Sequence, residues 1–459
     1  MKTFDLIVIG AGSGLDVAAG AAEQGLNVAI VEEGPLGGTC LNRGCIPSKM
    51  VIHSADVADT IASANTFGIT ASLKTINFKQ VTDRANKEVD ADARAIEQGV
   101  KAAKNEKLFK GRGRFIAPYT LEVNGQKITG KKIVIAAGAR SSLPPIEGLD
   151  TVPYMTSTEA LRQTKLPKSM IILGGGYIGV EMGHFYASLG CNITIVQRGP
   201  LLIPREDKDV ADIFTNIWKK KYTVLTNTDA KKVEKKGSNV IVTIQTGNKT
   251  GKIIAEKLLV ATGVKPNTDT LQVDKTGVKT NKYGFITVNK FMETNVKNIW
   301  ALGDIAGVYL FKHSANLEAE YVLHNILKNK KQAIDYYPMP HAIFTNPQIA
   351  GVGLTEQEAQ EKKLNYGVGK YFYKHTGMGA ALEEKDGFVK FIVDTKSREI
   401  LGCHILGPEA SILLHEVCVA MKANKKKALE IIRNTIHVHP AMSEIVQRAA
   451  WNVQTSNKD

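Results

Sequence analysis

The chain has few cysteines and no long apolar run, and each scarcity excludes a class of protein. Five cysteines among 459 residues are too few for the disulfide framework of a secreted protein. No uninterrupted hydrophobic stretch approaches the ~18 residues that a transmembrane helix needs. The first ten residues lead directly into a glycine motif, without the layout of a signal peptide. We therefore expect a cytoplasmic protein with no membrane partner.

Aromatic residues are also scarce, at 7% of the chain, although the net charge is +14. A basic surface attracts polyanions, so this charge raises the question of nucleic-acid binding. The lysines are scattered in short clusters, however, and no aromatic-interleaved stripe accompanies them. We expect a solvated basic surface and no nucleic-acid partner, with weak attraction to anionic substrates or partners as the alternative.

Glycine, in contrast, is abundant: there are 41 glycines, and 43% of the residues are hydrophobic. This composition is typical of a globular, turn-rich protein. A chain of 459 residues exceeds what one hydrophobic core usually holds. We therefore expect two to four domains.

The N-terminal segment predicts a βαβ unit that binds a dinucleotide. The predicted elements are a strand over residues 5–9, a helix over 17–22 and a strand over 27–31. Gly10 and Gly12 allow the tight turn and let the backbone approach a pyrophosphate at the helix N-terminus. Glu32, at the end of the second strand, lies at the usual distance to hold a ribose hydroxyl. Because the third fingerprint position is Leu15, we expect Gly14 to supply the close helix–strand packing.

The same pattern recurs in mid-chain. The predicted elements are a strand over residues 170–173, a helix over 181–189 and a strand over 192–196. Here all three fingerprint glycines are present, as Gly174, Gly176 and Gly179. Each unit is followed later by a strand that ends in a similar tripeptide, closing at Gly138 and at Gly263. Two dinucleotide sites suit electron transfer between two cofactors better than a simple dehydrogenase.

Cys40 and Cys45 lie five positions apart, directly downstream of the first unit. A short helical or turned segment could bring both sulfurs within disulfide reach, although the spacing permits that bond without proving it. Because the thiolate is the nucleophile in disulfide exchange, one sulfur should be accessible and the other held against an electron acceptor. The remaining cysteines have no partner at motif spacing, so we expect them to be buried: these are Cys191, Cys403 and Cys418. No cysteine and histidine set has zinc-ligand spacing, and no metal is expected.

With these features in one order, the sequence resembles the class I FAD-dependent pyridine nucleotide-disulfide oxidoreductases along essentially its whole length. The resemblance includes residues 299–304, which are similar to the family's second FAD motif, and residues 437–444 near the C-terminus. It implies an α/β fold with two Rossmann-like dinucleotide-binding domains, for FAD and NAD(P), and a C-terminal α+β dimerisation domain. The implied boundaries are 1–147 for FAD, 148–267 for NAD(P), 268–338 completing the FAD domain, and 339–459 for dimerisation.

The resemblance also implies catalytic roles. Cys45 matches the thiol that contacts the flavin, and Cys40 matches the exposed thiol that attacks the substrate disulfide. Lys49 matches a lysine near the flavin's reducible nitrogen, with Glu181 as its ion-pair partner. A positive charge there favours the reduced, anionic flavin, and the paired carboxylate lowers the cost of burying it.

His439 resembles the family's general acid and base, with Glu444 orienting it, and in the family this pair comes from the partner subunit of a homodimer. Imidazole suits the role because it titrates near neutral pH. His437 is expected to be structural.

By the same resemblance the expected cofactor contacts fall into two sets. The FAD set is Gly10, Gly12, Gly14, Glu32, Gly38, Thr39, Gly138 and Asp304, the last placed for the ribityl chain. The NAD(P) set is Gly174, Gly176, Tyr177, Gly179, Gln197, Arg198, Arg205 and Gly263.

The second unit bears on the choice between NADPH and NADH. An acid at the end of its second strand would bind the ribose of NAD and repel a 2′-phosphate, but this position is Gln197. Arg198 and Arg205 resemble the arginine pair that grips the phosphate of NADPH, and the planar fork of arginine suits that task. Tyr177 resembles the flavin-covering tyrosine of glutathione reductase. Gly179 in place of alanine favours NADH. We expect NADPH, with NADH possible.

The leading functional hypothesis is a homodimeric flavoenzyme that passes electrons from NADPH through FAD and the Cys40–Cys45 pair to a low-molecular-weight disulfide of the mycothione, glutathione or γ-glutamylcystine type. The alternative is dihydrolipoamide dehydrogenase, which runs the same machinery in reverse with NAD. A mercuric reductase is set aside because the chain ends without a further cysteine pair. A non-catalytic flavin-binding assembly subunit is the remote alternative. The substrate, the physiological direction and membership of a multienzyme complex stay open.

Overall fold

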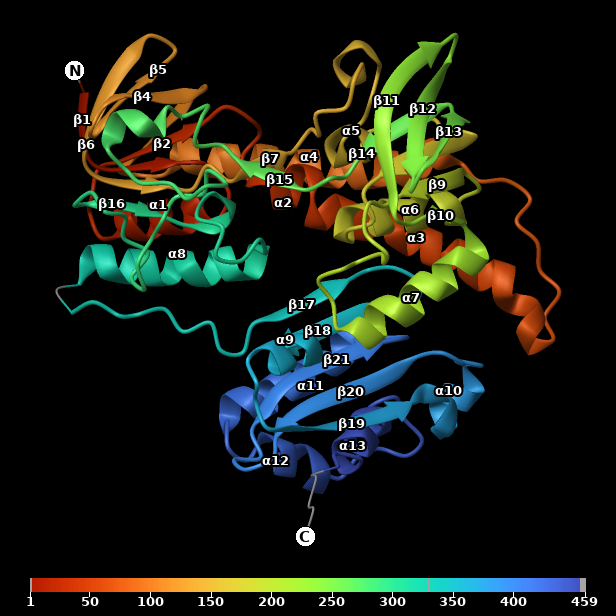
Figure 1. Ribbon diagram of the computed structural model, residues 1–459. Coiled ribbons are helices and arrows are strands. Elements are labelled where there is room, and N and C mark those ends of the chain that lie inside the picture. Colours follow the sequence, from red (N-terminus) through yellow and green to blue (C-terminus); the bar gives the residue numbers. More distant parts are fainter. Residues whose placement is uncertain (1, 329, 455–459) are drawn as a thin grey trace. The chain divides into compact units, whose positions relative to one another are not determined.

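The computed structural model describes residues 2–328 and 330–454, which form two compact units (Figure 1). The first unit comprises residues 1–50, 79–142 and 263–336, and the second comprises 51–78, 143–262 and 337–459. Met1, Asn329 and the last five residues, which belong to the predicted domains, lie outside the described residues. No helix in the described ranges is long and apolar enough to cross a membrane.

The first unit is built on a seven-stranded sheet with the order β3-β2-β1-β6-β5-β4, in which β16 pairs with β6. Its strands are β1 (Lys2–Ile9), β2 (Val28–Glu32), β3 (Glu106–Lys110), β4 (Gly113–Ala117), β5 (Thr120–Val123), β6 (Gln126–Ile135) and β16 (Ile299–Ala301), with β7 (Ala139–Ser141) and β15 (Val264–Pro266) in a separate pair. Its helices are α1 (Gly14–Glu23), α2 (Gly38–Arg43), α4 (Phe78–Ala102), α8 (Lys312–Leu327) and the beginning of α3 (Cys45–Ser63).

Parallel pairing explains the apolar composition of the central strands in this sheet. β1 pairs in parallel with β2 and with β6, and β6 pairs in parallel with β16. A parallel sheet is covered on both faces, so its strands read as continuous hydrophobic runs, as residues 6–9 do. α1 and α8 lie side by side and pack against each other (Figure 1). A segment near residue 300 thus completes the sheet begun by the N-terminal βαβ unit.

The second unit contains three further sheets. A parallel sheet of order β10-β9-β8-β14 is formed by β8 (Ser169–Leu173), β9 (Asn192–Val196), β10 (Thr223–Leu225) and β14 (Lys257–Val260), and an antiparallel one by β11 (Thr228–Lys236), β12 (Asn239–Thr246) and β13 (Lys249–Ala255). A five-stranded antiparallel sheet, here called the C-terminal sheet, has the order β17-β18-β21-β20-β19. Its strands are β17 (Pro340–Ile343), β18 (Ile349–Gly353), β19 (Tyr366–Phe372), β20 (Phe388–Asp394) and β21 (Ile400–Leu406).

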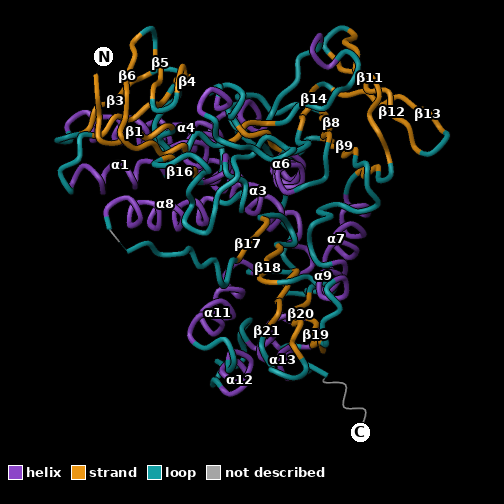
Figure 2. Tube along the Cα trace, turned by 60° about the vertical axis from the view of Figure 1, so that its left-hand side comes forward, coloured by secondary structure: helices purple, strands orange, loops and turns teal. Residues whose placement is uncertain are grey.

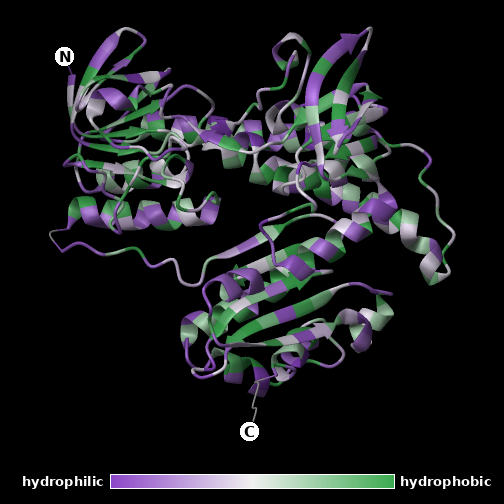
Figure 3. Ribbon diagram, in the orientation of Figure 1, coloured by the Kyte–Doolittle hydropathy of each residue, from purple (hydrophilic) through white to green (hydrophobic). Residues whose placement is uncertain are grey.

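Helices of the second unit pack on its parallel sheet and on the C-terminal sheet (Figure 2). They are α5 (Ser157–Ala160), α6 (Tyr177–Ser188), α7 (Lys208–Lys221), α9 (Glu356–Glu361), α10 (Gly377–Ala381), α11 (Ala410–Ala423), α12 (Ala428–Asn434) and α13 (Glu444–Trp451). Short 3-10 helices occupy Ala64–Phe67, Leu149–Thr151, Val273–Thr276, Gly303–Ile305 and Tyr373–His375. α11 packs on β18 and β21, and α13 packs on β19 and β20. Hydrophobic residues are frequent in the strands of the C-terminal sheet (Figure 3), and those of β18, β20 and β21 form one buried cluster with residues of α11, α12 and α13.

The two predicted βαβ units are present, and in each the first strand and the helix are longer than the pattern indicated. α1 begins at Gly14 rather than at residue 17, and α6 begins at Tyr177 rather than at 181. Each helix starts directly after its glycine turn, because the turn itself supplies the reversal that a separate loop would otherwise need. The expected α/β fold with a C-terminal α+β part is therefore confirmed.

Candidate functional site

The first glycine turn is shaped by close backbone contacts. Gly10 has φ +101°, and a Cβ there would lie 2.2 Å from the carbonyl oxygen of Ala136, so only glycine fits. A Cβ on Gly14 would lie 2.8 Å from Val8 Cγ1, which confirms that Gly14 makes the close helix–strand contact. Gly138 also adopts a positive φ, of 64°. The turn thus brings β1, α1 and the end of β6 into close contact.

Glu32 is fixed beside this turn. Its Oε2 accepts the amide hydrogen of Ala11 at 2.8 Å, and its Oε1 accepts that of Gly34 at 2.7 Å. A Cβ on Gly38 would come within 2.7 Å of the Cα of Gly12. Glycine at both positions therefore lets the start of α2, where Thr39 follows Gly38, lie close to the glycine turn. The carboxylate is therefore held at the carboxyl end of β2, where dinucleotide ribose is bound in such folds.

The N-terminus of α1 carries no side-chain cap. The hydroxyl of Ser13 instead donates to Asn316 Oδ1 at 2.9 Å and accepts from Lys312 Nζ at 2.8 Å, both on α8. An uncapped helix N-terminus with a nearby lysine favours an anion electrostatically. Together with the glycine-lined approach, this arrangement fits the pyrophosphate of a dinucleotide.

The dithiol lies at the junction of two helices. Cys40 is on α2 and Cys45 is the first residue of α3, and Gly44 stands between the helices, where a Cβ would lie 2.9 Å from the carbonyl oxygen of Thr39. A hydrogen bond with the Cys45 thiol, together with burial, raises the pKa of Cys40, while the positive charge of Lys312 opposes the rise. Cys40 is half-buried and Cys45 is exposed. The two thiols are thus within interaction distance. The expectation that Cys40 is the exposed thiol is wrong for this structure, because Cys45, at the start of α3, is the more exposed of the two.

Lys49 follows one turn after Cys45 on α3, and its Nζ donates to Ser48 Oγ at 3.3 Å. In the second unit, Glu181 on α6 accepts the amide hydrogen of Phe344 through Oε1 at 3.0 Å. The ion pair of Lys49 with Glu181 stays a prediction. Both residues are on helices that begin next to a glycine turn or the dithiol.

Asp304 lies in the 3-10 helix that follows β16, and burial raises the pKa of its carboxyl group. Sequence reasoning missed its neighbour Glu318 on α8. Glu318 Oε2 accepts the amide hydrogen of Gly303 at 2.5 Å, and Oε1 accepts the hydroxyl of Tyr336 at 2.8 Å. Glu318 therefore fixes the turn that presents Asp304. Glu318 comes fourteen residues after Asp304, and no local sequence pattern predicts that it contacts the turn before Asp304.

The second glycine turn has the same backbone plan as the first. Gly174 has φ +104°, and a Cβ there would lie 2.4 Å from the carbonyl oxygen of Ala261. A Cβ on Gly179 would lie 2.0 Å from the carbonyl oxygen of Gly174. α6 has Gly176 as its N-cap and no side-chain cap, and Gly263, after β14, has φ +111°. This helix N-terminus likewise fits a phosphate group.

Gln197 occupies the place that Glu32 has in the first unit. Its Oε1 accepts the amide hydrogen of Gly175 at 3.0 Å, and its Nε2 donates to the carbonyl oxygen of Leu201 at 3.1 Å. Arg198 and Arg205 are both exposed. The carboxyl end of β9 therefore presents a neutral amide with two arginines in the following loop.

Tyr177 begins α6, and its hydroxyl donates to Oε1 of the buried Glu206. Glu206 Oε2 pairs with His341 Nε2 at 2.9 Å, and the rings of Tyr177 and His341 stack with centroids 6.2 Å apart. Burial, with the charge of Glu206, raises the pKa of Tyr177, and Arg205 lies near enough to lower it. Sequence reasoning missed Glu206 and His341. The acid at position 206, directly after Arg205, was the available sequence signal.

His439 Nδ1 lies 3.0 Å from Glu444 Oε1. The imidazole is 75% exposed and the carboxylate 9% exposed, so the acid is held in the protein and the base faces outward. The hydrogen bond with His439 is the main cause that lowers the pKa of Glu444 and keeps it ionised. His437 is nearly buried, with Nε2 3.7 Å from Glu416 Oε2. Such a pair can hold a tautomer and transfer a proton.

Cys191, Cys403 and Cys418 are buried, as expected. Burial raises the pKa of Cys191 to about 12 and that of Cys418 to about 11, so both stay protonated. Across residues 2–328 and 330–454, no three histidine, cysteine or acidic side chains are grouped to hold a metal ion.

Comparison with known proteins gives the class. The family model of the pyridine nucleotide-disulphide oxidoreductases matches residues 4–329, and that of their dimerisation domain matches residues 339–450. The chain belongs to this family, and it is a flavoprotein disulfide oxidoreductase of a kind that uses FAD and NAD(P)H.

Three relatives show how close the resemblance is. The chain is 35% identical to a mycothione reductase of Mycobacterium tuberculosis, covering 98% of this chain and 99% of that one. It is 36% identical to a dihydrolipoyl dehydrogenase of Geobacillus stearothermophilus, covering 97% and 95%. Among solved structures, a Cu(II) complex of the HOCl-induced flavoprotein disulfide reductase RclA from Escherichia coli matches with a TM-score of 0.88 at 29% identity, covering 99% and 100%.

Proposed function

We propose that the protein reduces a low-molecular-weight disulfide with electrons from NADPH, through FAD and the Cys40–Cys45 pair. The single observation that carries this proposal is Gln197 at the carboxyl end of β9, hydrogen-bonded to Gly175 N where a carboxylate would repel a 2′-phosphate. Arg198 and Arg205 are exposed in the loop that follows and supply the positive charge. Disulfide reductases of this family normally consume NADPH.

In the sequence, Gly179 favours NADH, because NADPH enzymes of the family commonly have alanine at this fingerprint position. Its Cβ would lie 2.0 Å from the carbonyl oxygen of Gly174, so packing alone requires glycine in this turn. This residue therefore weighs little in the choice of nucleotide. We also propose that the domains have the boundaries predicted from the sequence and that FAD and NADPH bind at the two predicted sets of residues, including Thr39 and Asp304.

Bound FAD would supply the means of passing a pair of electrons from the nucleotide to the thiols. The chain's own residues do the rest. The Cys40 thiolate attacks one sulfur of the substrate disulfide and forms a mixed disulfide, releasing the first thiol. Cys45 then attacks Cys40, releasing the second thiol and leaving a Cys40–Cys45 disulfide. Two electrons from NADPH return this disulfide to the dithiol. Lys49 would lie near the reducible nitrogen of bound flavin, with Glu181 as its ion-pair partner.

His439 protonates the leaving thiolate, and Glu444 holds the imidazole in the required tautomer. We propose that this pair serves the partner subunit of a homodimer. The segment around His439 and helices α11 and α12 expose large apolar side chains, which a soluble surface rarely gathers: they are Ile412, Val419, Ile431, Ile436 and Val438. They lie at or beside a groove of about 760 Å³.

The three buried cysteines are free thiols, which suits a reducing compartment, and we propose that the protein is cytoplasmic.

Steady-state kinetics test the proposal. We expect efficient oxidation of NADPH with a panel of disulfides of the mycothione, glutathione and γ-glutamylcystine type. Efficient reduction of NAD by dihydrolipoamide would instead establish the second candidate, which the 36% identity to a dihydrolipoyl dehydrogenase favours. Cys45→Ser should abolish turnover and the long-wavelength absorbance of a thiolate beside flavin, whereas Cys191→Ser, at a buried cysteine outside the site, should change neither.

A further inference from the structure

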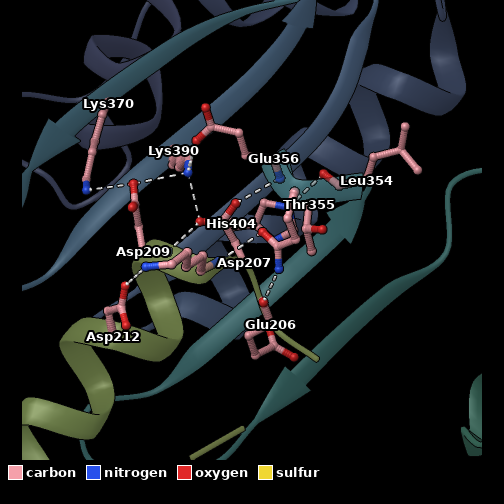
Figure 4. A network of polar contacts seen from close by, with 12 residues as sticks. Glu206, Asp207, Asp209, Asp212, Leu354, Thr355, Glu356, Lys370, Lys390 and His404 are labelled. Atoms are coloured by element: carbon pink, nitrogen blue, oxygen red, sulfur yellow. Dashed lines mark hydrogen bonds and ion pairs between the residues drawn. The ribbon is translucent and has the colours of Figure 1, made fainter. Parts of the chain in front are cut away.

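The four residues that follow Arg205 are fastened to the C-terminal sheet and to α9. We call residues 206–209 the anchor segment (Figure 4). Asp207 Oδ1 lies 2.8 Å from Lys390 Nζ on β20, and Asp207 Oδ2 accepts the amide hydrogen of Glu356 at 3.0 Å. Asp209 Oδ2 lies 3.0 Å from the same Lys390 Nζ. The segment that begins α7 is thus bound by residues roughly 150 to 180 positions later in the chain.

Lys390 is the centre of these contacts. Its side chain is 1% exposed, and its ammonium group also lies 2.6 Å from Glu356 Oε2. Burial opposes its charge, but hydrogen bonds with Asp207, Glu356 and Asp209 raise the pKa of Lys390, so it remains a cation. A buried charge enclosed by partners defines one geometry, because any displacement leaves it unpaired.

Gln357 holds the backbone of the same segment. Its Nε2 donates to the carbonyl oxygen of Glu206 at 2.8 Å, and its Oε1 accepts the amide hydrogen of Lys208 at 3.1 Å. The Glu206 side chain is meanwhile bound to Tyr177 and His341. The backbone of the anchor segment and the side chains of Glu206, Asp207 and Asp209 are therefore held in place.

The other side of Arg205 is fixed as well. The amide of Ile203 donates to the carbonyl oxygen of Gly175, in the glycine turn, at 2.7 Å, and the amide of Glu206 donates to the carbonyl oxygen of Ile203 at 3.0 Å. Ile203 has φ +45°, a conformation that a β-branched residue rarely adopts and that persists only where the surroundings impose it. Arg205 thus stands in a tight turn held between the glycine turn and the anchor segment.

We propose that Lys390 and Gln357 are positioning residues that hold Arg205 in place for the 2′-phosphate of NADPH, so that the C-terminal part of the chain sets nucleotide specificity. The proposal rests on the proposed use of NADPH. Neither residue is part of a glycine turn or of the thiol site. Loss of the anchor should misplace Arg205, which only NADPH needs, and leave the binding of the nucleotide's remaining groups intact.

The test measures KM and kcat with NADPH and with NADH for purified full-length variants. For Gln357→Ala and Lys390→Met, KM for NADPH should rise about tenfold, while KM for NADH and both kcat values change less than twofold. Lys425→Met is the matched control: this lysine is 57% exposed, pairs with Glu399 at 3.4 Å and should change nothing. If Lys390→Met fails to fold, Gln357→Ala and Glu356→Gln test the same anchor with less disturbance.

Arg205→Leu separates the two proposals. If it leaves the ratio of KM values for NADPH and NADH unchanged, the use of NADPH through Arg205 is wrong, and the anchor proposal is wrong with it. If Arg205→Leu raises KM for NADPH but the Gln357 and Glu356 variants do not, the anchor proposal alone is overturned. An equal rise of KM for both nucleotides in the anchor variants would also overturn it. Combining Gln357→Ala with Arg205→Leu should add no further loss.

Discussion

The two glycine turns share one backbone plan but differ in the residue at the end of the second strand. Gly10 and Gly174 have φ values of 101° and 104°, and each lies against the carbonyl oxygen of the alanine directly after a strand, β6 or β14. Glu32 accepts a backbone amide hydrogen of the first turn, and Gln197 accepts that of the second. The hydrogen bond is thus kept while the negative charge is lost. The glycines leave room for the backbone of a dinucleotide, and we propose that this one side chain influences which dinucleotide binds.

The third glycine position differs as well. In the second unit Gly179 faces the backbone carbonyl of Gly174, whereas in the first unit the close contact is shifted to Gly14 and involves side chains. Side chains can move to accept an added methyl group, but backbone within a tight turn cannot. The second turn should therefore tolerate change less than the first.

The largest expected effect tests this difference in packing. Gly179→Ala should lower the free energy of unfolding by about 3 kcal/mol, because its methyl group would overlap a backbone oxygen. Gly14→Ala should cost about 1 kcal/mol, since Val8 and Ala136 present only side-chain atoms. Urea denaturation measures both. Gly176→Ala is the control, because a Cβ there meets nothing within 4 Å. Equal losses at 14 and 179 would contradict the interpretation.

The next effect comes from giving the second turn the charge of the first. Gln197→Glu should keep the hydrogen bond to Gly175 and raise KM for NADPH about tenfold to a hundredfold, through repulsion of the 2′-phosphate. KM for NADH should fall. Gln197→Ala removes the hydrogen bond without adding charge, so it should weaken both nucleotides alike. An unchanged preference in Gln197→Glu would rule out this position as the determinant.

The reciprocal change in the first turn should have a smaller effect. Glu32→Gln leaves one oxygen to serve the two amides of Ala11 and Gly34, which we expect to cost about 1–2 kcal/mol. The dissociation constant of FAD, measured by flavin fluorescence, should rise about tenfold. Glu33→Gln is the matched control, since this neighbour is 54% exposed and pairs only at the surface with Arg112. Retention of FAD equal to that of the unmodified protein would argue against a role for Glu32.

The smallest effect concerns pH. In the first unit, hydrogen bonds from Arg140 chiefly lower the pKa of Asp269 below its ordinary value of 3.8. A lowered carboxyl pKa adds stability above the unfolded value, and this is lost as the pH falls below about 4. In the second unit, the raised pKa of Lys390 adds stability below its ordinary value of 10.5, which is lost as the pH rises beyond it.

Hydrogen exchange measured across this pH range should therefore show acid loosening near β7 and β15 and alkaline loosening around the anchor segment. The acid effect should be under about 1 kcal/mol, because Asp269 and Arg140 are both well exposed. Asp269→Asn should abolish the acid loosening, whereas Asp274→Asn should not. Acid loosening that persists in Asp269→Asn would show that another carboxyl group is responsible.

Much of the fold could be predicted because its signals are local. Alternation between apolar runs and glycine turns located both βαβ units, with errors of a few residues at the helix starts. The cysteine spacing indicated an exchanging pair, but it suggested one short segment where the structure has the junction of α2 and α3. The pairing of β16 with β6 could not be derived from pattern alone, since about 165 residues separate the paired strands.

The sequence by itself determined the family, the two dinucleotide turns, the dithiol and the neighbouring His439 and Glu444, because each depends on residues close together in the chain. Only the tertiary structure decided which groups support them. Glu318 on Gly303, Glu206 on Tyr177 and Lys390 on Asp207 join distant segments, and their charges are stable in the interior only when the folded chain supplies each partner. No local sequence pattern predicts such contacts between distant residues.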